Sequence, residues 1–204
     1  MRRTLAALAV LAGLVLLTGC GGNAGNAAES DGELRGAVLD TPYVVPPAPL
    51  RDTTGAEYSL TRDTDKPLTL VFFGYTHCPD ICQVVMSTVA SALTRLDDAD
   101  RERVEVAFVT TDPARDTGPV LRKYLAHFDP EFIGLTGDLD TIVKIGKPLA
   151  VAVENGEKLP SGGYDVVHST HVSGIGSDDE VSIVWTQGTS AADFASDIHQ
   201  LLAR

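Results

Sequence analysis

The most constraining feature of this sequence is a short apolar run, residues 68–73, that leads directly into two cysteines, Cys78 and Cys82. A nearly continuous apolar run of this length is typical of a strand buried on both faces. Residues 81–96 then carry apolar side chains at helical spacing, which predicts a helix directly after the cysteine turn. A buried strand followed by a helix is the unit from which α/β proteins are built.

The rest of the chain continues this alternation. Further strands are expected at residues 104–109, 132–135, 150–153, 170–175 and 181–185, and further helices at residues 117–128, 138–145 and 191–202. The turn-forming residues 176–179 between the last two strands predict a hairpin. This order predicts an α/β fold with a central mixed sheet flanked by helices. The cysteines would then lie where such a fold presents its strand ends and helix N-termini to ligands.

The N-terminus has the features of an export signal. Arg2 and Arg3 precede an apolar run, residues 5–17, and the sequence Leu17-Thr18-Gly19-Cys20 follows. The run is shorter than the roughly 20 residues that span a bilayer, which favours a cleaved signal over an uncleaved anchor. The ending resembles a bacterial lipobox, in which Cys20 carries the lipid. We therefore expect a signal peptide over residues 1–19, a flexible tether over residues 20–41 and a folded domain over residues 42–204.

The charge of the chain limits its partners. The formal net charge is −12, and nucleic-acid binding needs Lys and Arg to neutralise phosphates. An acidic surface is equally unsuited to holding an anionic membrane by charge, so the lipid has to supply the anchor. The sequence thus predicts no nucleic-acid partner and a lipid-anchored protein on the extracytoplasmic face of the cell membrane.

Cys78 and Cys82 are the remaining cysteines once Cys20 is lipidated. Such a pair outside the cytoplasm is a disulfide, a redox dithiol or a metal site. Pro79 suits the first turn of a helix, and residues four apart share a helix face, so both sulfurs would point the same way. The helix N-terminus favours thiolates, and two soft sulfurs favour Cu(I), Zn or similar metals. A structural disulfide would close only a small loop and add little stability, which favours the metal or redox interpretation.

Two thiolates rarely complete a metal site, so one of the five histidines is expected to join them. His127 and His199 lie in predicted helices and are interpreted as solvated residues. His77, next to the turn, either tunes its charge or is an exposed loop residue. His168 and His171 lie in a predicted loop that enters a strand, a setting typical of functional residues. Spacing alone does not choose between these two.

Four segments together resemble the Sco/SenC family of copper-binding, thioredoxin-like proteins. They are Phe73-Gly74-Tyr75-Thr76-His77-Cys78-Pro79-Asp80-Ile81-Cys82, Thr111-Asp112-Pro113-Ala114-Arg115-Asp116-Thr117, Phe132-Ile133-Gly134-Leu135-Thr136-Gly137 and Tyr164-Asp165-Val166-Val167-His168-Ser169-Thr170. Their occurrence in this order is far more specific than any one of them. With the strands around them they cover about residues 50–202.

The resemblance implies a thioredoxin-like fold and copper, as Cu(I), Cu(II) or both, bound by Cys78, Cys82 and His168. It also implies a metallochaperone that helps to build the dinuclear copper site of cytochrome c oxidase, with the oxidase subunit carrying that site as its partner. The rival interpretation is an enzyme, a thiol-disulfide oxidoreductase or a redox sensor that uses Cys78 and Cys82. In the second segment, Asp116 is interpreted as a cap of the following helix, and Asp112 is expected to face the copper turn.

Overall fold

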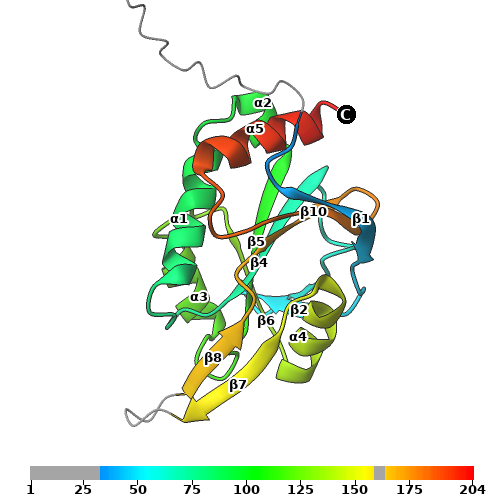
Figure 1. The fold of residues 1–204 in the computed structure, drawn as a ribbon. Coiled ribbons are helices and arrows are strands. Elements are labelled where there is room, and N and C mark those ends of the chain that lie inside the picture. The colour runs from blue at the N-terminus through cyan, green and yellow to red at the C-terminus, as the bar shows by residue number, and fades with distance from the viewer. Residues whose placement is uncertain (1–32, 159–163) are drawn as a thin grey trace, which may run out of the picture. The chain divides into compact units, whose positions relative to one another are not determined.

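The computed structural model describes residues 33–158 and 164–204, with the main chain alone described at residues 154–158 and 164–168 (Figure 1). The predicted signal peptide, Cys20 with its predicted lipid and most of the predicted tether lie outside the described residues. Residues 32–204 belong to one compact unit. None of the helices in the described part of the chain is both long and apolar enough to cross a membrane.

An eight-stranded sheet forms the centre of the described domain, in the order β1-β10-β9-β4-β5-β6-β2-β3. Its strands are β1 (Ala37–Val44), β2 (Leu50–Asp52), β3 (Glu57–Tyr58), β4 (Leu68–Gly74), β5 (Val104–Thr110), β6 (Ile133–Thr136), β9 (Val172–Gly176) and β10 (Glu180–Trp185). The strands β4, β5 and β6 run parallel, whereas β9 runs antiparallel to β4. The predicted mixed sheet is therefore confirmed.

Helices cover both faces of this sheet (Figure 1). They are α1 (Ile81–Leu93), α2 (Asp98–Arg101), α3 (Gly118–Leu125), α4 (Leu139–Gly146) and α5 (Ala191–Leu202), with a short 3₁₀ turn at Lys147–Leu149 after α4. One core contains Leu70 and Phe72 of β4 together with residues of α1, α3 and α5. The other contains Val71 and Phe73 together with residues of α4.

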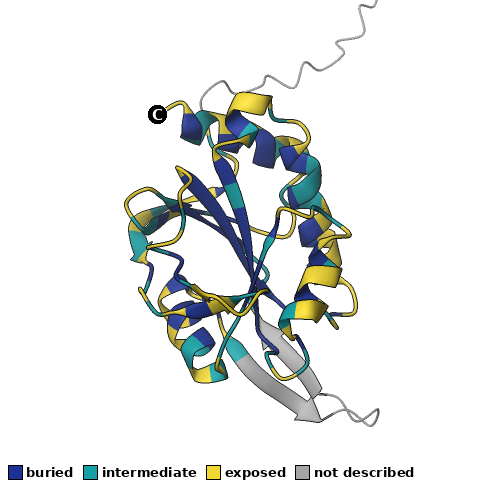
Figure 2. Cartoon of the chain, turned by 180° about the vertical axis from the view of Figure 1, so that it is seen from behind, coloured by how far each residue is buried: buried dark blue, intermediate teal, exposed yellow. Residues whose placement is uncertain are grey.

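The strand β4 explains why the cysteine turn is held firmly. Every residue of β4 is buried, because alternate side chains enter the two cores. Figure 2 shows the central strands as the most deeply buried part of the described domain. A strand packed on both faces gives the turn that follows Gly74 a fixed starting point.

The region between α4 and β9 differs from the prediction. Ala150 adopts a left-handed conformation with φ 56° after the 3₁₀ turn, so the strand predicted at residues 150–153 is wrong except at its last residue. A two-stranded sheet follows, made of β7 (Val153–Lys158) and β8 (Tyr164–His168). His168, expected in a loop, is instead the last residue of β8 and pairs with Val153. The sequence of β7 is polar and lacks the apolar alternation that would have revealed it.

The first described strand lies partly before residue 42, where the sequence suggested that the domain starts. β1 starts at Ala37 and pairs with β10. The buried carboxylate of Asp197 accepts hydrogen bonds from the main-chain N–H groups of Arg35 and Gly36 and from the Trp185 indole. These contacts bind the chain before β1 to α5. They join residues far apart in the sequence, so no local sequence pattern predicts them.

Candidate functional site

The cysteine turn links β4 to α1. The main-chain N–H of Cys78 donates to the Tyr75 carbonyl at 3.2 Å, which closes a tight turn before the helix. Helix α1 begins at Ile81 and is capped by the Asp80 carboxylate, so Cys78 lies outside the helix and Cys82 is its second residue. Both cysteines are buried, with Cys78 4% exposed and Cys82 0% exposed. The helix therefore starts later than Pro79 suggested, but both sulfurs remain at its N-terminus.

The two sulfurs are neighbours. Cys78 and Cys82 are thiols and are not joined by a disulfide. The main-chain N–H of Cys82 donates to the Cys78 sulfur at 3.3 Å. A hydrogen bond with Cys78 and burial together raise the pKa of the Cys82 thiol. A helix N–H aimed at a sulfur favours negative charge there, so this end of α1 is suited to stabilising charge on the Cys78 sulfur.

Gly74 makes room for the second sulfur. A Cβ at this position would lie 3.0 Å from the Cys82 sulfur and 2.7 Å from Cε1 of Phe72. It would also lie 3.1 Å from Cε2 of Phe108. Contacts this short are tighter than packed side chains tolerate, so the position requires a glycine.

Asp116 binds the start of the cysteine turn through hydrogen bonds. Its fully buried carboxylate accepts hydrogen bonds from the Thr76 N–H at 2.9 Å, the Thr76 hydroxyl at 2.6 Å and the Thr110 hydroxyl at 2.7 Å. The cap interpretation of Asp116 is wrong, because the N-cap of α3 is Thr117 and makes no side-chain cap bond. Parallel pairing of β4 with β5 brings the ends of the two strands together, so the loop after β5 supports the turn after β4.

Asp112 belongs to the same supporting loop. It is 1% exposed and forms an ion pair with Arg115, whose guanidinium carbon lies 5.9 Å from the centre of the Tyr75 ring. The Thr111 N–H donates to the Gly74 carbonyl at 2.7 Å, which ties this loop directly to the end of β4. Asp112 thus helps to hold Arg115 over the ring of Tyr75, a residue of the turn.

Three of the five histidines, His77, His127 and His199, lie at the surface. His77 is largely exposed, with Nδ1 3.1 Å from the Thr76 hydroxyl and 3.8 Å from the Asp116 carboxylate. His127 is exposed beyond α3, as expected. His199 of α5 is exposed but pairs with Asp100 of α2, a contact the sequence did not reveal. This hydrogen bond raises the pKa of His199.

The strand that carries His168, β8, is followed along the chain by β9, which starts beside the end of β4. Val172, the first residue of β9, pairs with Phe72 near the end of β4. His168 lies four residues before Val172, a distance of at most about 14 Å along an extended chain. The side chain of His168 lies outside the described residues.

Ser169 ties the end of β8 to the chain that enters β7. Its hydroxyl donates to the Ala150 carbonyl at 3.1 Å and accepts from the Ala152 N–H at 3.2 Å. The adjoining pairing of Val153 with His168 continues this connection. Ser169 is therefore a clamp at the base of the hairpin, one residue from His168.

His171 is engaged elsewhere. Its Nε2 lies 3.2 Å from the Leu149 carbonyl, and burial lowers the pKa of His171, which favours the neutral ring. Between the two histidines that the sequence left open, this contact gives His171 a structural role at the base of the hairpin.

Of the three predicted copper ligands, the side chains of Cys78 and Cys82 are among those the structure describes. Among them there is no group of three or more His, Cys, Asp or Glu residues placed to hold a metal ion. Two adjacent sulfurs at a helix N-terminus suit a soft ion such as Cu(I), with a nitrogen ligand still to be supplied. The fit with copper thus rests on the chemistry of the sulfur pair.

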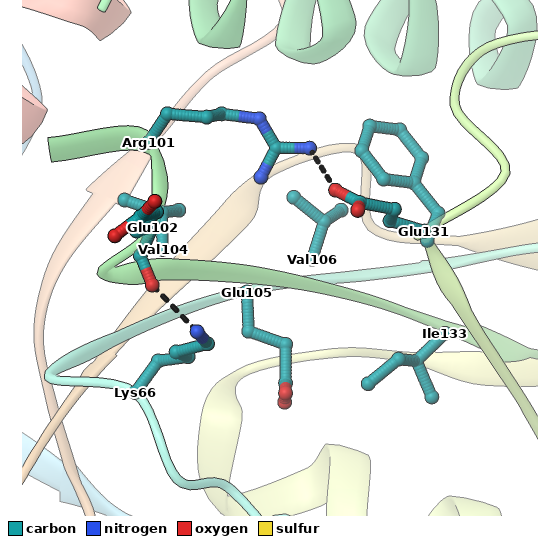
Figure 3. Close-up of a pocket in the computed structure, with 9 residues that line it drawn as sticks. Lys66, Arg101, Glu102, Val104, Glu105, Val106, Glu131 and Ile133 are labelled. Carbon is teal, nitrogen blue, oxygen red and sulfur yellow. Dashed lines mark hydrogen bonds and ion pairs between the residues drawn. The ribbon is translucent and has the colours of Figure 1, made fainter. Parts of the chain in front are cut away.

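A cavity of about 280 Å³ lies away from this site (Figure 3). It is lined by the first residues of β5 and β6, at the opposite end of the parallel strands from the cysteines. Its cations are already engaged: Lys66 donates to the Glu102 carbonyl, and Arg101 pairs with Glu131 and Asp129. These contacts describe a structural ion-pair network.

The chain is similar to one family of known proteins. The sequence pattern of the family described as SCO1/SenC matches residues 41–203. Over 125 residues the chain is 35% identical to the mitochondrial protein SCO2 of Saccharomyces cerevisiae. This match covers 56% of this chain and 42% of the yeast protein. The chain spans about half the length of the curated relatives it matches.

Two solved structures with copper bound are similar to the described domain. ScoI of Bradyrhizobium japonicum with copper bound has a TM-score of 0.68 and 29% identity, covering 77% of this chain and 98% of that chain. Yeast Sco1 with copper bound has a TM-score of 0.69 and 25% identity, covering 80% of this chain and 88% of that chain.

Proposed function

The chain belongs to the SCO1/SenC family, and from that premise we propose that it is a membrane-anchored copper metallochaperone. In this proposal Cys78, Cys82 and His168 bind copper and deliver it to the dinuclear copper site of cytochrome c oxidase. The fold is the thioredoxin-like one expected from the sequence, a mixed sheet flanked by helices and shared with copper-bound Sco proteins.

The observation that carries the proposal is the pair of buried thiols at the N-terminus of α1. The Cys78 sulfur already accepts a hydrogen bond from the Cys82 N–H, so charge on that sulfur is stabilised before any metal arrives. Two thiolates stabilise Cu(I), and an imidazole suits either oxidation state of copper. His168 is the preferred nitrogen ligand, because it lies four residues before Val172, which pairs with Phe72 near the cysteine end of β4, and because His171 is bonded to Leu149.

The chemistry proposed is ligand exchange, without turnover of a substrate. A site with only three protein ligands leaves copper open to attack by the ligands of a partner, which can replace these one at a time. The proposed lipid at Cys20 and the tether after it would keep this search at the extracytoplasmic membrane surface and raise the effective concentration of the partner.

A second candidate function is thiol-disulfide exchange with the oxidase subunit or redox sensing. It is favoured by the proximity of the two thiols, which are placed to be oxidised together to a disulfide. His168 separates the two functions, because an oxidoreductase needs the cysteines but no nitrogen ligand. If His168→Ala retains oxidase assembly in cells while Cys78→Ala abolishes it, the dithiol chemistry is the function.

The proposed function is tested by loading the reduced full-length chain with Cu(I) and measuring the copper retained after gel filtration. We expect one copper per chain for the parent and much less for Cys78→Ala, Cys82→Ala and His168→Ala. His127→Ala, which changes an exposed histidine beyond α3, serves as the matched control and should retain the parental amount. A parent chain that retains no copper would overturn the metallochaperone proposal.

A further inference from the structure

His77 is an exposed nitrogen donor directly before the buried cysteine pair. Its side chain is 56% exposed, whereas Cys78 is 4% exposed and Cys82 is 0% exposed. A copper ion that arrives on a carrier therefore meets the surface of the turn before it meets either sulfur. On that surface His77 adjoins Cys78 in the chain, with the two Cα atoms about 3.8 Å apart.

A chain of hydrogen bonds orients the ring of His77. Its Nδ1 lies 3.1 Å from the Thr76 hydroxyl oxygen, and that hydroxyl donates to the Asp116 carboxylate at 2.6 Å. A hydroxyl has a single proton to donate, and the carboxylate, which accepts, takes it. The Thr76 oxygen is then an acceptor toward the ring, so Nδ1 of His77 carries the ring proton.

This arrangement makes Nε2 the metal-binding atom of the ring. When Nδ1 of a neutral imidazole is protonated, the lone pair that binds a metal is on Nε2. Both contacts of the ring within the described residues, with Thr76 and with Asp116, are made by Nδ1. Histidines that bind metals are typically oriented in this way, with the other ring N–H donated to an oxygen of the protein. Because Asp116 is fully buried and also binds Thr110, the ring is oriented from inside the fold.

His77 is not placed as a permanent third ligand. Among the side chains that the structure describes, no group of three His, Cys, Asp or Glu residues is placed to hold a metal ion, so His77 does not converge with the two cysteines. Its exposed Nε2 is suited instead to a copper ion that is on its way to the sulfurs.

We propose that His77 is an entry ligand, whose Nε2 binds Cu(I) from an incoming carrier and passes it to the Cys78 sulfur. This inference rests on the proposed function. A bond from copper to Nε2 forms as a bond to the carrier breaks. A bond from copper to the sulfur then replaces the bond to Nε2, and a proton that the sulfur carries leaves to solvent. Copper stays Cu(I) throughout, so no electron is transferred. The first contact makes the second step intramolecular and thereby faster.

The test follows copper loading of the reduced full-length chain by stopped-flow absorbance, with the Cu(I) complex of a chromophoric chelator as the carrier. His77→Asn keeps an N–H₂ group near the position of Nδ1 and lacks Nε2. We expect the second-order rate constant of transfer to fall by about tenfold or more. The equilibrium copper affinity and the melting temperature of the metal-free chain should stay at the parental values, because the final ligands and the fold are unchanged.

His127→Asn is the matched control. His127 is also exposed, but it lies beyond α3 with its Nδ1 3.2 Å from the Tyr124 carbonyl, so its loss should leave the rate constant unchanged. A parental rate constant for His77→Asn would overturn the inference and leave the proposed function standing. An equal loss of affinity and rate would also overturn it, since His77 would then be a permanent ligand. So would a lower melting temperature, since the imidazole would then support the fold. A parent that takes up no copper would overturn both proposals.

Discussion

The carboxylate of Asp116 accepts both the main-chain N–H and the hydroxyl of Thr76, two residues before the first cysteine. A third hydrogen bond comes from Thr110, at the end of β5. The carboxylate thus joins the ends of two parallel strands and fixes the start of the cysteine turn.

The first prediction concerns this carboxylate. Asp116→Asn replaces one acceptor oxygen by an N–H₂ group that faces existing donors, so we expect a loss of about 2 kcal/mol in the free energy of unfolding. Copper affinity should fall as well, because the turn loses its anchor. Urea denaturation and chelator competition measure the two effects. Thr110→Ser keeps the hydroxyl that donates to Asp116 and accepts from the Asp112 N–H, so it should give a smaller loss, and a larger effect from Thr110→Ser would contradict this expectation.

The second prediction concerns the space that Gly74 leaves for the Cys82 sulfur. Gly74→Ala places a methyl group 3.0 Å from that sulfur and 2.7 Å from the Phe72 ring. Overpacking of this kind costs about 1–3 kcal/mol, and displacement of the sulfur should weaken copper binding. Gly188→Ala is the control, because a Cβ there meets nothing within 4 Å. Equal stability and copper affinity for both variants would show that the sulfur tolerates displacement.

The third prediction concerns the clamp one residue beyond His168. Ser169→Ala removes the hydroxyl that bridges Ala150 and Ala152, so the end of β8 is held less firmly. We expect weaker copper binding with less than about 1 kcal/mol change in the free energy of unfolding, since the bridge lies at an exposed hairpin base. Ser87→Ala, on the exposed side of α1, should change neither quantity. Unchanged copper affinity for Ser169→Ala would rule out the clamp as a positioning element.

The fourth prediction is a pH dependence from His199 and Asp100, whose Nδ1 and Oδ2 atoms lie 2.5 Å apart. Because the contact raises the pKa of His199, its stabilisation is complete below the ordinary pKa of 6.5 and is lost as the pH rises through the raised value. His199→Gln should therefore lower the urea midpoint at acid pH more than at alkaline pH, and salt should reduce the difference. In an Asp100→Asn background the pH-dependent difference should shrink to the smaller contribution of Asp97, and its persistence at full size would assign it to another group.

The sequence predicted those elements whose local pattern agrees with their packing. Helix α5 was predicted with both ends, because Phe194, Ile198 and Leu201 recur at helical spacing; the first two are buried and Leu201 packs against the same core. Strand β4 was equally clear, since all of its residues are buried. The turn after it could be recognised because the cysteines directly follow this apolar run.

The missed features depend on contacts between distant residues. The Asp116 carboxylate precedes a helix, so its local pattern indicates a cap, and only the pairing of β4 with β5 brings it to Thr76. Strand β7, which pairs with β8, is polar and short, and it has no apolar period to detect.

The most direct measurement of the central claim is X-ray absorption at the copper edge of the Cu(I)-loaded full-length chain. The account predicts two sulfur ligands and one nitrogen ligand per copper in the parent, and loss of the nitrogen with retention of both sulfurs in His168→Ala. A copper with identical ligands in the parent and in His168→Ala would contradict it, because the imidazole of residue 168 would then have no part in the site.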